Sequence, residues 1–176
     1  PIYASVRRSK VNFQVGDQVV YPPQGGGTIQ AVVEREVLGR PQQYLKVVFV
    51  RGDMDVLVPL EKAQEVGLRR TVSEDEFDRL PEQALLDTEL PEQWPPRFRV
   101  EQDILARCDT FELARLIGTL TRRDAERGLA STEREILETA RALLASELAV
   151  VRGSSLADGE LWIDGVLLQQ PAEEDA

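Results

Sequence analysis

The chain has 176 residues, of which 42% are hydrophobic, and a formal net charge of −10 at pH 7. It contains no histidine, and Cys108 is its single cysteine, which excludes a histidine-based catalytic triad, an internal disulfide and a cysteine-histidine metal cluster. We therefore expect a protein that is not an enzyme and binds no metal, cofactor or small-molecule substrate. Because there is no run of about 18 apolar residues and no apolar leader at the start, we expect it in the cytoplasm, not in a membrane.

The charge and the residue types are unevenly distributed, which predicts an α+β fold. Residues 1–70 are rich in valine and glycine and carry a net charge of +3, and we interpret them as a β-domain. Residues 71–92, with a net charge of −7, are predicted to be an acidic linker or helix. Residues 93–150 have a helical composition and a net charge of −1, and residues 151–176 form an acidic tail of −5. Nucleic-acid contact by the helical domain is therefore not excluded by the total charge.

Short β-branched runs separated by turn residues follow Phe13 and are typical of a small Tudor/SH3-like β-barrel. The predicted strands cover residues 18–21, 28–35, 44–50 and 55–59. The predicted turns lie at 25–27, 38–41 and 51–53. We interpret the three glycines at 25–27 as a hairpin turn and not as a phosphate-binding loop, because no lysine-serine or lysine-threonine pair follows them.

The run VGDQVVYP at residues 15–22, with the glycine-rich segment after it, resembles the RNA polymerase interaction domain of the CarD/CdnL family, which also occurs in the transcription-repair coupling factor Mfd. The resemblance implies docking on the β subunit of bacterial RNA polymerase by extension of a sheet, in which an edge strand pairs with a partner strand. It places candidate polymerase contacts at Arg35, Val56, Leu57 and Val58. Leu57 stands where the family often has a basic residue, and Arg35 can equally be a solvated charge at a strand end.

Ser73 and Glu76 have the spacing of a capping box, which predicts a helix from there to about Leu86. Phe77, Leu80 and Leu85 are its expected apolar contacts. The next segment, WPPRFR at residues 94–99, is predicted to be extended or a turn, because a residue before proline disfavours helical backbone angles. Trp94 is there either an exposed wedge against nucleic-acid bases or a core residue, and both readings stay open.

Two further helices are predicted, one capped by Asp109 with Glu112 and ending near Gly128, the other capped by Thr132 with Glu135. Apolar residues recur in them at helical spacing and are expected to form the core: Leu113, Leu116, Ile117, Leu120, Ile136, Leu137, Ala140, Leu143, Leu144 and Leu148. In the tail, residues 161–168 are predicted to form a small hairpin with a turn at Asp164-Gly165.

The run LTRRDAERGLAS at residues 120–131 is similar to the C-terminal domain of CarD/CdnL proteins. The resemblance implies that Trp94 wedges into the DNA minor groove at the upstream edge of the melted promoter, with Arg97 and Arg99 near phosphates. Pro95 and Pro96 replace polar or basic residues there. Two arginines of the run, Arg123 and Arg127, are further candidate DNA contacts, although they can equally pair with nearby acids.

The function implied is that of a transcription regulator that docks on the RNA polymerase holoenzyme and stabilises the promoter open complex, without strong DNA sequence specificity. The alternative is a protein-only adaptor that links polymerase to a second protein, with Trp94 as an interface anchor.

Overall fold

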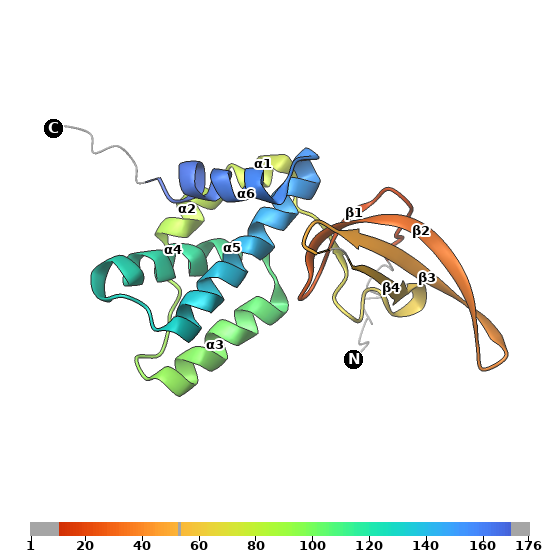
Figure 1. Ribbon diagram of the computed structural model, residues 1–176, viewed down its shortest axis with the longest axis horizontal. Coiled ribbons are helices and arrows are strands. Elements are labelled where there is room, and N and C mark those ends of the chain that lie inside the picture. The colour runs from red at the N-terminus through yellow and green to blue at the C-terminus, as the bar shows by residue number, and fades with distance from the viewer. Residues whose placement is uncertain (1–10, 53, 170–176) are drawn as a thin grey trace, which may run out of the picture.

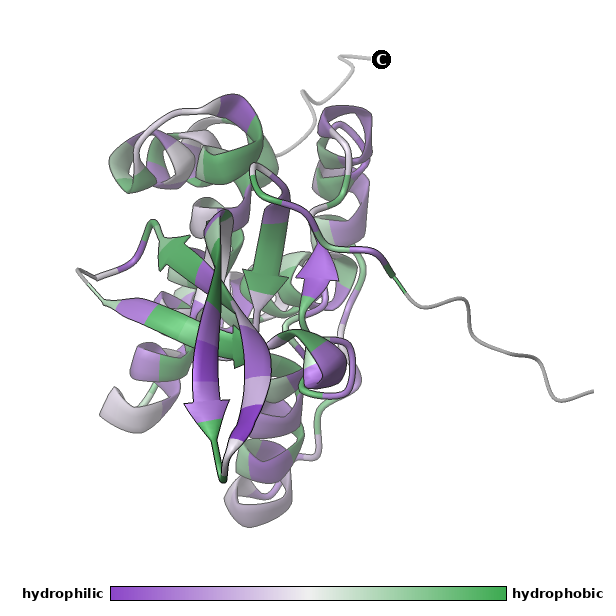
Figure 2. Cartoon of the chain, turned by 90° about the vertical axis from the view of Figure 1, so that its right-hand side faces the viewer, coloured by the Kyte–Doolittle hydropathy of each residue, from purple (hydrophilic) through white to green (hydrophobic). Residues whose placement is uncertain are grey.

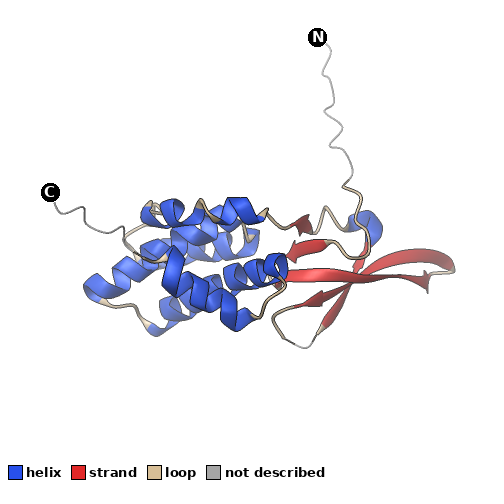
Figure 3. Cartoon of the chain, turned by 90° about the horizontal axis from the view of Figure 1, so that it is seen from above, coloured by secondary structure: helices blue, strands red, loops and turns tan. Residues whose placement is uncertain are grey.

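The computed structural model describes residues 11–52 and 54–169. A sheet occupies one end of the molecule and a bundle of helices the other (Figures 1 and 3). The predicted α+β class is confirmed. The basic N-terminal segment at residues 5–10 lies outside the described residues. Within the described part, no helix combines the length and the apolar composition needed to cross a bilayer.

The sheet contains five antiparallel strands: β1 (Gln18–Tyr21), β2 (Gly25–Val37), β3 (Arg40–Phe49), β4 (Asp55–Pro59) and β5 (Arg69–Arg70). Their order is β4-β3-β2-β1-β5, so among the described residues β4 and β5 are the two edges and the barrel is open. A 3₁₀ turn, η1 (Leu60–Lys62), follows β4. The interior of the sheet is apolar, with Val19, Ile29, Leu45, Val47 and Val58 nearly inaccessible to solvent. The outer part of the β2–β3 hairpin projects from the body and is mostly hydrophilic (Figure 2).

The glycines at 25–27, expected as a turn, instead begin β2 and pair with β1. The reason is a close approach by a helix, α5 (Ser131–Arg152). The backbone N–H of Gly26 donates to Ser146 Oγ at 2.9 Å. A Cβ at Gly26 would lie 2.4 Å from the carbonyl oxygen of Ser146, so a side chain has no room there. Glycine is present at this point of the strand because another backbone approaches closely, and not because the chain turns.

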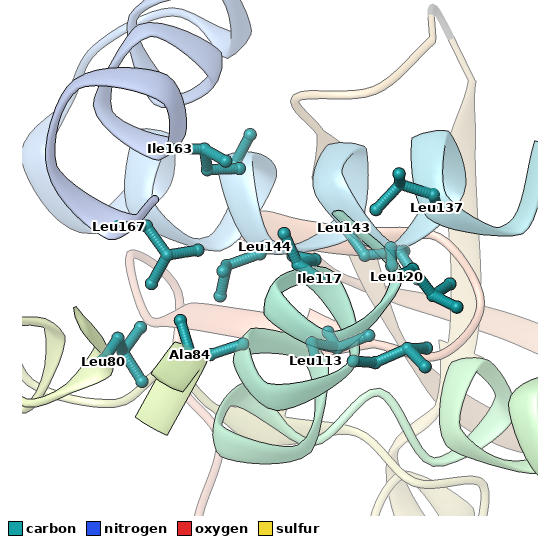
Figure 4. Close-up of a cluster of buried hydrophobic side chains, with 14 of the residues drawn as sticks. Leu80, Ala84, Leu113, Ile117, Leu120, Leu137, Leu143, Leu144, Ile163 and Leu167 are labelled. Atoms are coloured by element: carbon teal, nitrogen blue, oxygen red, sulfur yellow. The ribbon is translucent and has the colours of Figure 1, made fainter. Parts of the chain in front are cut away.

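The helical region consists of α1 (Glu74–Phe77), α2 (Leu80–Leu85), α3 (Trp94–Arg107), α4 (Thr110–Arg127), α5, α6 (Leu156–Trp162) and a π-helical turn, η2 (Ile163–Leu167). The predicted apolar stripes of α4 and α5 are buried in one core, to which α2, α6 and η2 also contribute (Figure 4). Asp109 caps α4 as expected, by accepting from the backbone N–H groups of Phe111 and Glu112. The third cap was predicted incorrectly, because α5 begins at Ser131 with Ala130 as its N-cap and Glu133 turned inward.

Residues 71–92, expected as an acidic linker or helix, contain two short helices that pack against the helical core. The Ser73–Glu76 capping box is confirmed, but it opens two short helices in place of one. Leu85 is exposed, and Ala84 takes the inward position, where it contacts Gly118 of α4. Small residues at both positions let α2 and α4 approach closely.

The predicted hairpin at 161–168 is wrong, since these residues belong to α6 and η2. Ser155 and Asp158 form a capping box, and Gly159, Ile163 and Leu167 then recur at helical spacing and are buried. The Asp-Gly pair that suggested a turn lies on the exposed side, where Asp164 accepts from Arg141 at 2.7 Å. The final residues, 170–176, lie outside the described part.

The sheet and the helices are joined by a buried polar contact. Both terminal nitrogens of Arg69 in β5 donate to the carboxylate of Glu147 in α5, at 3.0 and 2.9 Å. The same carboxylate accepts from Thr110 Oγ1 at 2.7 Å and from the backbone N–H of Val72 at 3.0 Å. With Gly26 held by Ser146 nearby, these bonds position the two halves relative to each other.

Candidate functional site

Trp94 is the first residue of α3, and Pro95 and Pro96 occupy the first turn after it. The segment is therefore helical and not extended as expected, because first-turn N–H groups have no intrahelical acceptor and proline loses nothing there. The ring is partly buried. It packs against Phe98 with 5.3 Å between ring centroids, and the guanidinium carbon of Arg97 lies 5.1 Å from the ring centroid. The ring touches the helical core and also reaches the surface, so its role as a wedge against nucleic-acid bases stays a prediction.

One face of α3 forms a shallow hollow of about 510 Å³ around this ring. It is lined by Trp94, Pro95, Phe98, Arg99, Gln102 and Asp103. Most of the lining surface is apolar, with one cation and one carboxylate at the rim. Figure 1 places the start of α3 at the end of the helical region that is farthest from the sheet. An open apolar hollow with an aromatic floor suits a flat or apolar group of a macromolecular partner.

Arg97, expected beside DNA phosphates, is buried. Its Nε donates to Glu133 Oε1 at 2.9 Å, and its Nη1 donates to the carbonyl oxygen of Glu92 at 2.6 Å. Its side chain is only 9% exposed. A guanidinium that is enclosed and bonded in this way cannot reach a phosphate, so the expected contact between Arg97 and DNA does not fit the structure.

The other predicted arginines differ in accessibility. Arg99 and Arg127 are exposed, Arg99 at the rim of the hollow and Arg127 in the last turn of α4. Arg123 points inward, with Nε 3.8 Å from Glu133 Oε1 and a side chain only 21% exposed. Arg99 and Arg127 are therefore the candidates that a phosphate can reach.

Two carboxylates that the sequence analysis missed, Glu101 and Glu133, lie between Arg97 and Arg123. Glu101 is fully buried, and among the described residues neither of its oxygens has a hydrogen-bond donor. Burial and the neighbouring Glu133 carboxylate raise the pKa of Glu101 to about 8, against the opposing effect of Arg97 and Arg123. The i, i+4 spacing of Arg97 and Glu101 was a signal for this cluster. Nothing local pointed to Glu133.

The raised pKa predicts a pH dependence of stability. The unfolded Glu101 carboxyl has its ordinary value of 4.5, so between pH 4.5 and about 8 the folded state holds more protons than the unfolded chain. The free energy of unfolding should therefore decrease as the pH rises through this range. Glu101→Gln cannot ionise, and we expect its melting temperature to decrease less than that of the wild type between about pH 5 and pH 9. Glu135→Gln, an exposed change on α5, is the control. Parallel curves for the wild type and Glu101→Gln would contradict the assignment.

The second predicted contact surface is β4, whose outer edge has no strand neighbour among the described residues. Leu57 is 40% exposed, Val56 is partly buried and Val58 is buried in the sheet core. Val58 can therefore offer a partner strand only its backbone. Arg35 is exposed on β2 opposite Gln42, in the hairpin beyond the end of β4. A groove of about 690 Å³ lies between this hairpin and η1, with Gln42, Tyr44 and Pro59 in its lining.

Among the described residues, no three cysteine or acidic side chains cluster as metal ligands. The described part of the chain does contain an unpaired strand edge at one end and an aromatic hollow at the other. Both features are suited to binding macromolecules.

Comparison with known proteins identifies the class. Residues 13–72 match the family described as "CarD-like/TRCF RID domain", and residues 83–164 match "CarD, C-terminal domain". The chain is also 30% identical over 153 residues to a Bacillus subtilis (strain 168) protein described as "Putative transcription factor YdeB". That alignment covers 80% of this chain and 93% of the relative. The protein is thus a transcription-associated factor with an RNA polymerase interaction domain. It belongs to the CarD family, as its sequence motifs indicated.

Proposed function

We propose that this protein docks on the β subunit of the RNA polymerase holoenzyme through β4 and stabilises the promoter open complex through the Trp94 hollow. The observation that carries the proposal is that a free strand edge and an accessible aromatic ring lie at opposite ends of one firmly joined molecule (Figure 3). A protein bound at one end then holds the other end at a fixed distance on the promoter.

The docking half is supported by the edge of β4. Its unpaired N–H and C=O groups can add a partner strand, with Leu57 exposed on the outer face to contact that partner. Arg35 is exposed on β2 in the hairpin beyond the end of β4, where it can add a charge to the contact. Because strand addition relies on backbone groups, it tolerates Leu57 at the position where the family often has a basic residue.

The DNA half is supported by the partly buried Trp94 ring, which lines the hollow, and by Arg99 at the rim of the same hollow. The ring can stack on a base or wedge into the minor groove at the upstream edge of the bubble, while Arg99 and Arg127 reach phosphates. Free DNA would be bound weakly, given a net charge of −10. Docking raises the local DNA concentration to the millimolar range, so a weak contact without sequence specificity is sufficient. Such a factor acts in the cytoplasm on polymerase-bound DNA and needs no cofactor or small-molecule substrate.

A protein-only adaptor is the second candidate, and Asp103 at the rim of the hollow favours it, because a carboxylate repels phosphate. In that case Trp94 would fill a pocket of a second protein. We rank it lower because an arginine lies at the same rim and a second arginine is exposed at the end of α4.

The test is the lifetime of promoter open complexes formed by holoenzyme with Trp94→Ala. Loss of one stacking contact of about 1 to 3 kcal/mol shortens the lifetime by roughly 5- to 150-fold, while polymerase affinity is unchanged. Leu161→Ala, which truncates an exposed apolar side chain on α6, is the control and should match the wild type. If Trp94→Ala leaves the lifetime unchanged but abolishes binding of another protein, the adaptor function is correct.

A further inference from the structure

Arg97 contacts the Trp94 ring from inside the helical region, beside the apolar core residues against which the ring also packs. The guanidinium carbon of Arg97 lies 5.1 Å from the ring centroid, yet Arg97 is not part of the lining of the hollow. It therefore contacts the ring from the interior side and leaves the surface side of the ring to the hollow.

Arg97 is itself fixed by bonds in several directions. Nε donates to Glu133 Oε1 at 2.9 Å, and Nη2 lies 3.4 Å from Glu133 Oε2, which makes a two-point contact with α5. Nη1 donates to the carbonyl oxygen of Glu92, the residue just before Gln93, which is the N-cap of α3. A planar guanidinium bonded at its edges in this way presents a fixed face to an aromatic ring.

We propose that Arg97 is a positioning residue that fixes the orientation of the Trp94 ring, and that Glu133 of α5 in turn fixes Arg97. The inference deepens the proposed function and rests on it, because it gives the ring its working orientation. Without Arg97, the Trp94 ring loses the cation on its inner face, and its remaining apolar contacts with Phe98 and the helical core allow it to sample other rotamers. A ring that must be reordered at each encounter stabilises a bubble less well.

Glu133 serves this role because its carboxylate contacts two guanidinium groups, those of Arg97 and Arg123. Arg123 approaches the same oxygen, Oε1, to 3.8 Å from the side of α4. The Glu133 carboxylate thus links the start of α3, the end of α4 and the start of α5. Because it also holds Arg97, the packing of these three helices fixes the position of the Trp94 ring.

The test uses two readouts on the full chain, both compared with the parent. The first is acrylamide quenching of Trp94 fluorescence in the free protein, in a Trp162→Phe background that leaves one tryptophan. Arg97→Met should make Trp94 more accessible to the quencher and lower its fluorescence anisotropy. Arg97→Lys, which keeps the charge but loses the planar face, should restore the parent values only in part. Unchanged quenching in both variants would overturn the inference.

The second readout is open-complex lifetime with holoenzyme, in a double-mutant cycle. Arg97→Met should shorten the lifetime by about 2- to 30-fold when Trp94 is present and by nothing further in a Trp94→Ala background. Additive effects would show that Arg97 acts only on stability and would overturn the positioning role. Arg107→Met, which removes the exposed ion pair with Glu112 at the other end of α3, is the control for loss of a surface arginine.

A second variant tests the inference if Arg97→Met unfolds too readily to measure. Glu133→Gln retains the side-chain volume but weakens the bonds to Arg97, so it should change the quenching of Trp94 in the same direction. Unchanged quenching in Glu133→Gln would overturn the inference. If Trp94→Ala has no effect on open complexes, the proposed function fails, but the quenching of the free protein still decides whether Arg97 orients the ring.

Discussion

Glu147→Ala should lower the free energy of unfolding by about 3 to 5 kcal/mol, because it breaks a buried ion pair and leaves its partner uncompensated. The Glu147 side chain is 2% exposed and accepts four hydrogen bonds, two of them from Arg69. Arg69 in β5 cannot withdraw fully into water, since it also donates to the Cys108 carbonyl oxygen at 2.8 Å. The Arg69 side chain is 30% exposed, which favours the lower part of the range.

Urea unfolding monitored by circular dichroism measures this loss. Glu138→Ala changes an exposed glutamate on the same helix and is the matched control, expected to stay within about 0.5 kcal/mol of the wild type. A Glu147→Ala protein as stable as that control would mean that the Arg69–Glu147 contact contributes nothing measurable to the joining of the sheet and the helices.

Gly26→Ala should destabilise by about 1 to 3 kcal/mol, or more, because the added methyl group meets backbone that cannot move aside. Its Cβ would lie 2.4 Å from the Ser146 carbonyl oxygen and 2.9 Å from the Glu147 Cα. Relief requires β2 and α5 to separate, which also strains the Arg69–Glu147 bond. We expect the folded variant to bind polymerase through β4 but to form shorter-lived open complexes, since the Trp94 hollow is then displaced relative to the sheet.

Thermal melting together with polymerase pull-down and open-complex decay tests this result. Gly165→Ala is the control, because a Cβ there meets nothing within 4 Å and alanine favours helical backbone. A Gly26→Ala protein with the wild-type melting temperature would show that the strand and helix can part without cost. Equal loss of polymerase binding and of open-complex lifetime would show that the two ends do not act separately.

Local patterns in the sequence were sufficient for the parts of this protein whose structure depends on near neighbours. The bounds of β1 and β4, the caps at Ser73 and Asp109, and the apolar stripes of α4 and α5 all follow from spacing over a few residues. The family resemblance likewise rests on two contiguous runs. The turn predicted at 38–41 is shorter in the structure, because β3 already begins at Arg40, and it places both Leu38 and Gly39 at positive φ, a conformation that glycine favours and leucine does not.

Only the tertiary structure decided the features whose partners lie far along the chain. Arg97 reads as a phosphate ligand until Glu133, 36 positions later, encloses it. The glycines at 25–27 read as a turn until Ser146, 120 positions from Gly26, occupies the space a side chain would need. The tail reads as a hairpin because Asp-Gly is a local turn signal, yet burial of Ile163 and Leu167 against the other helices outweighs it. A pattern over a few residues contains no information about the distant residues that bury or pair with a side chain. Those long-range contacts decided where Trp94 and Arg97 lie.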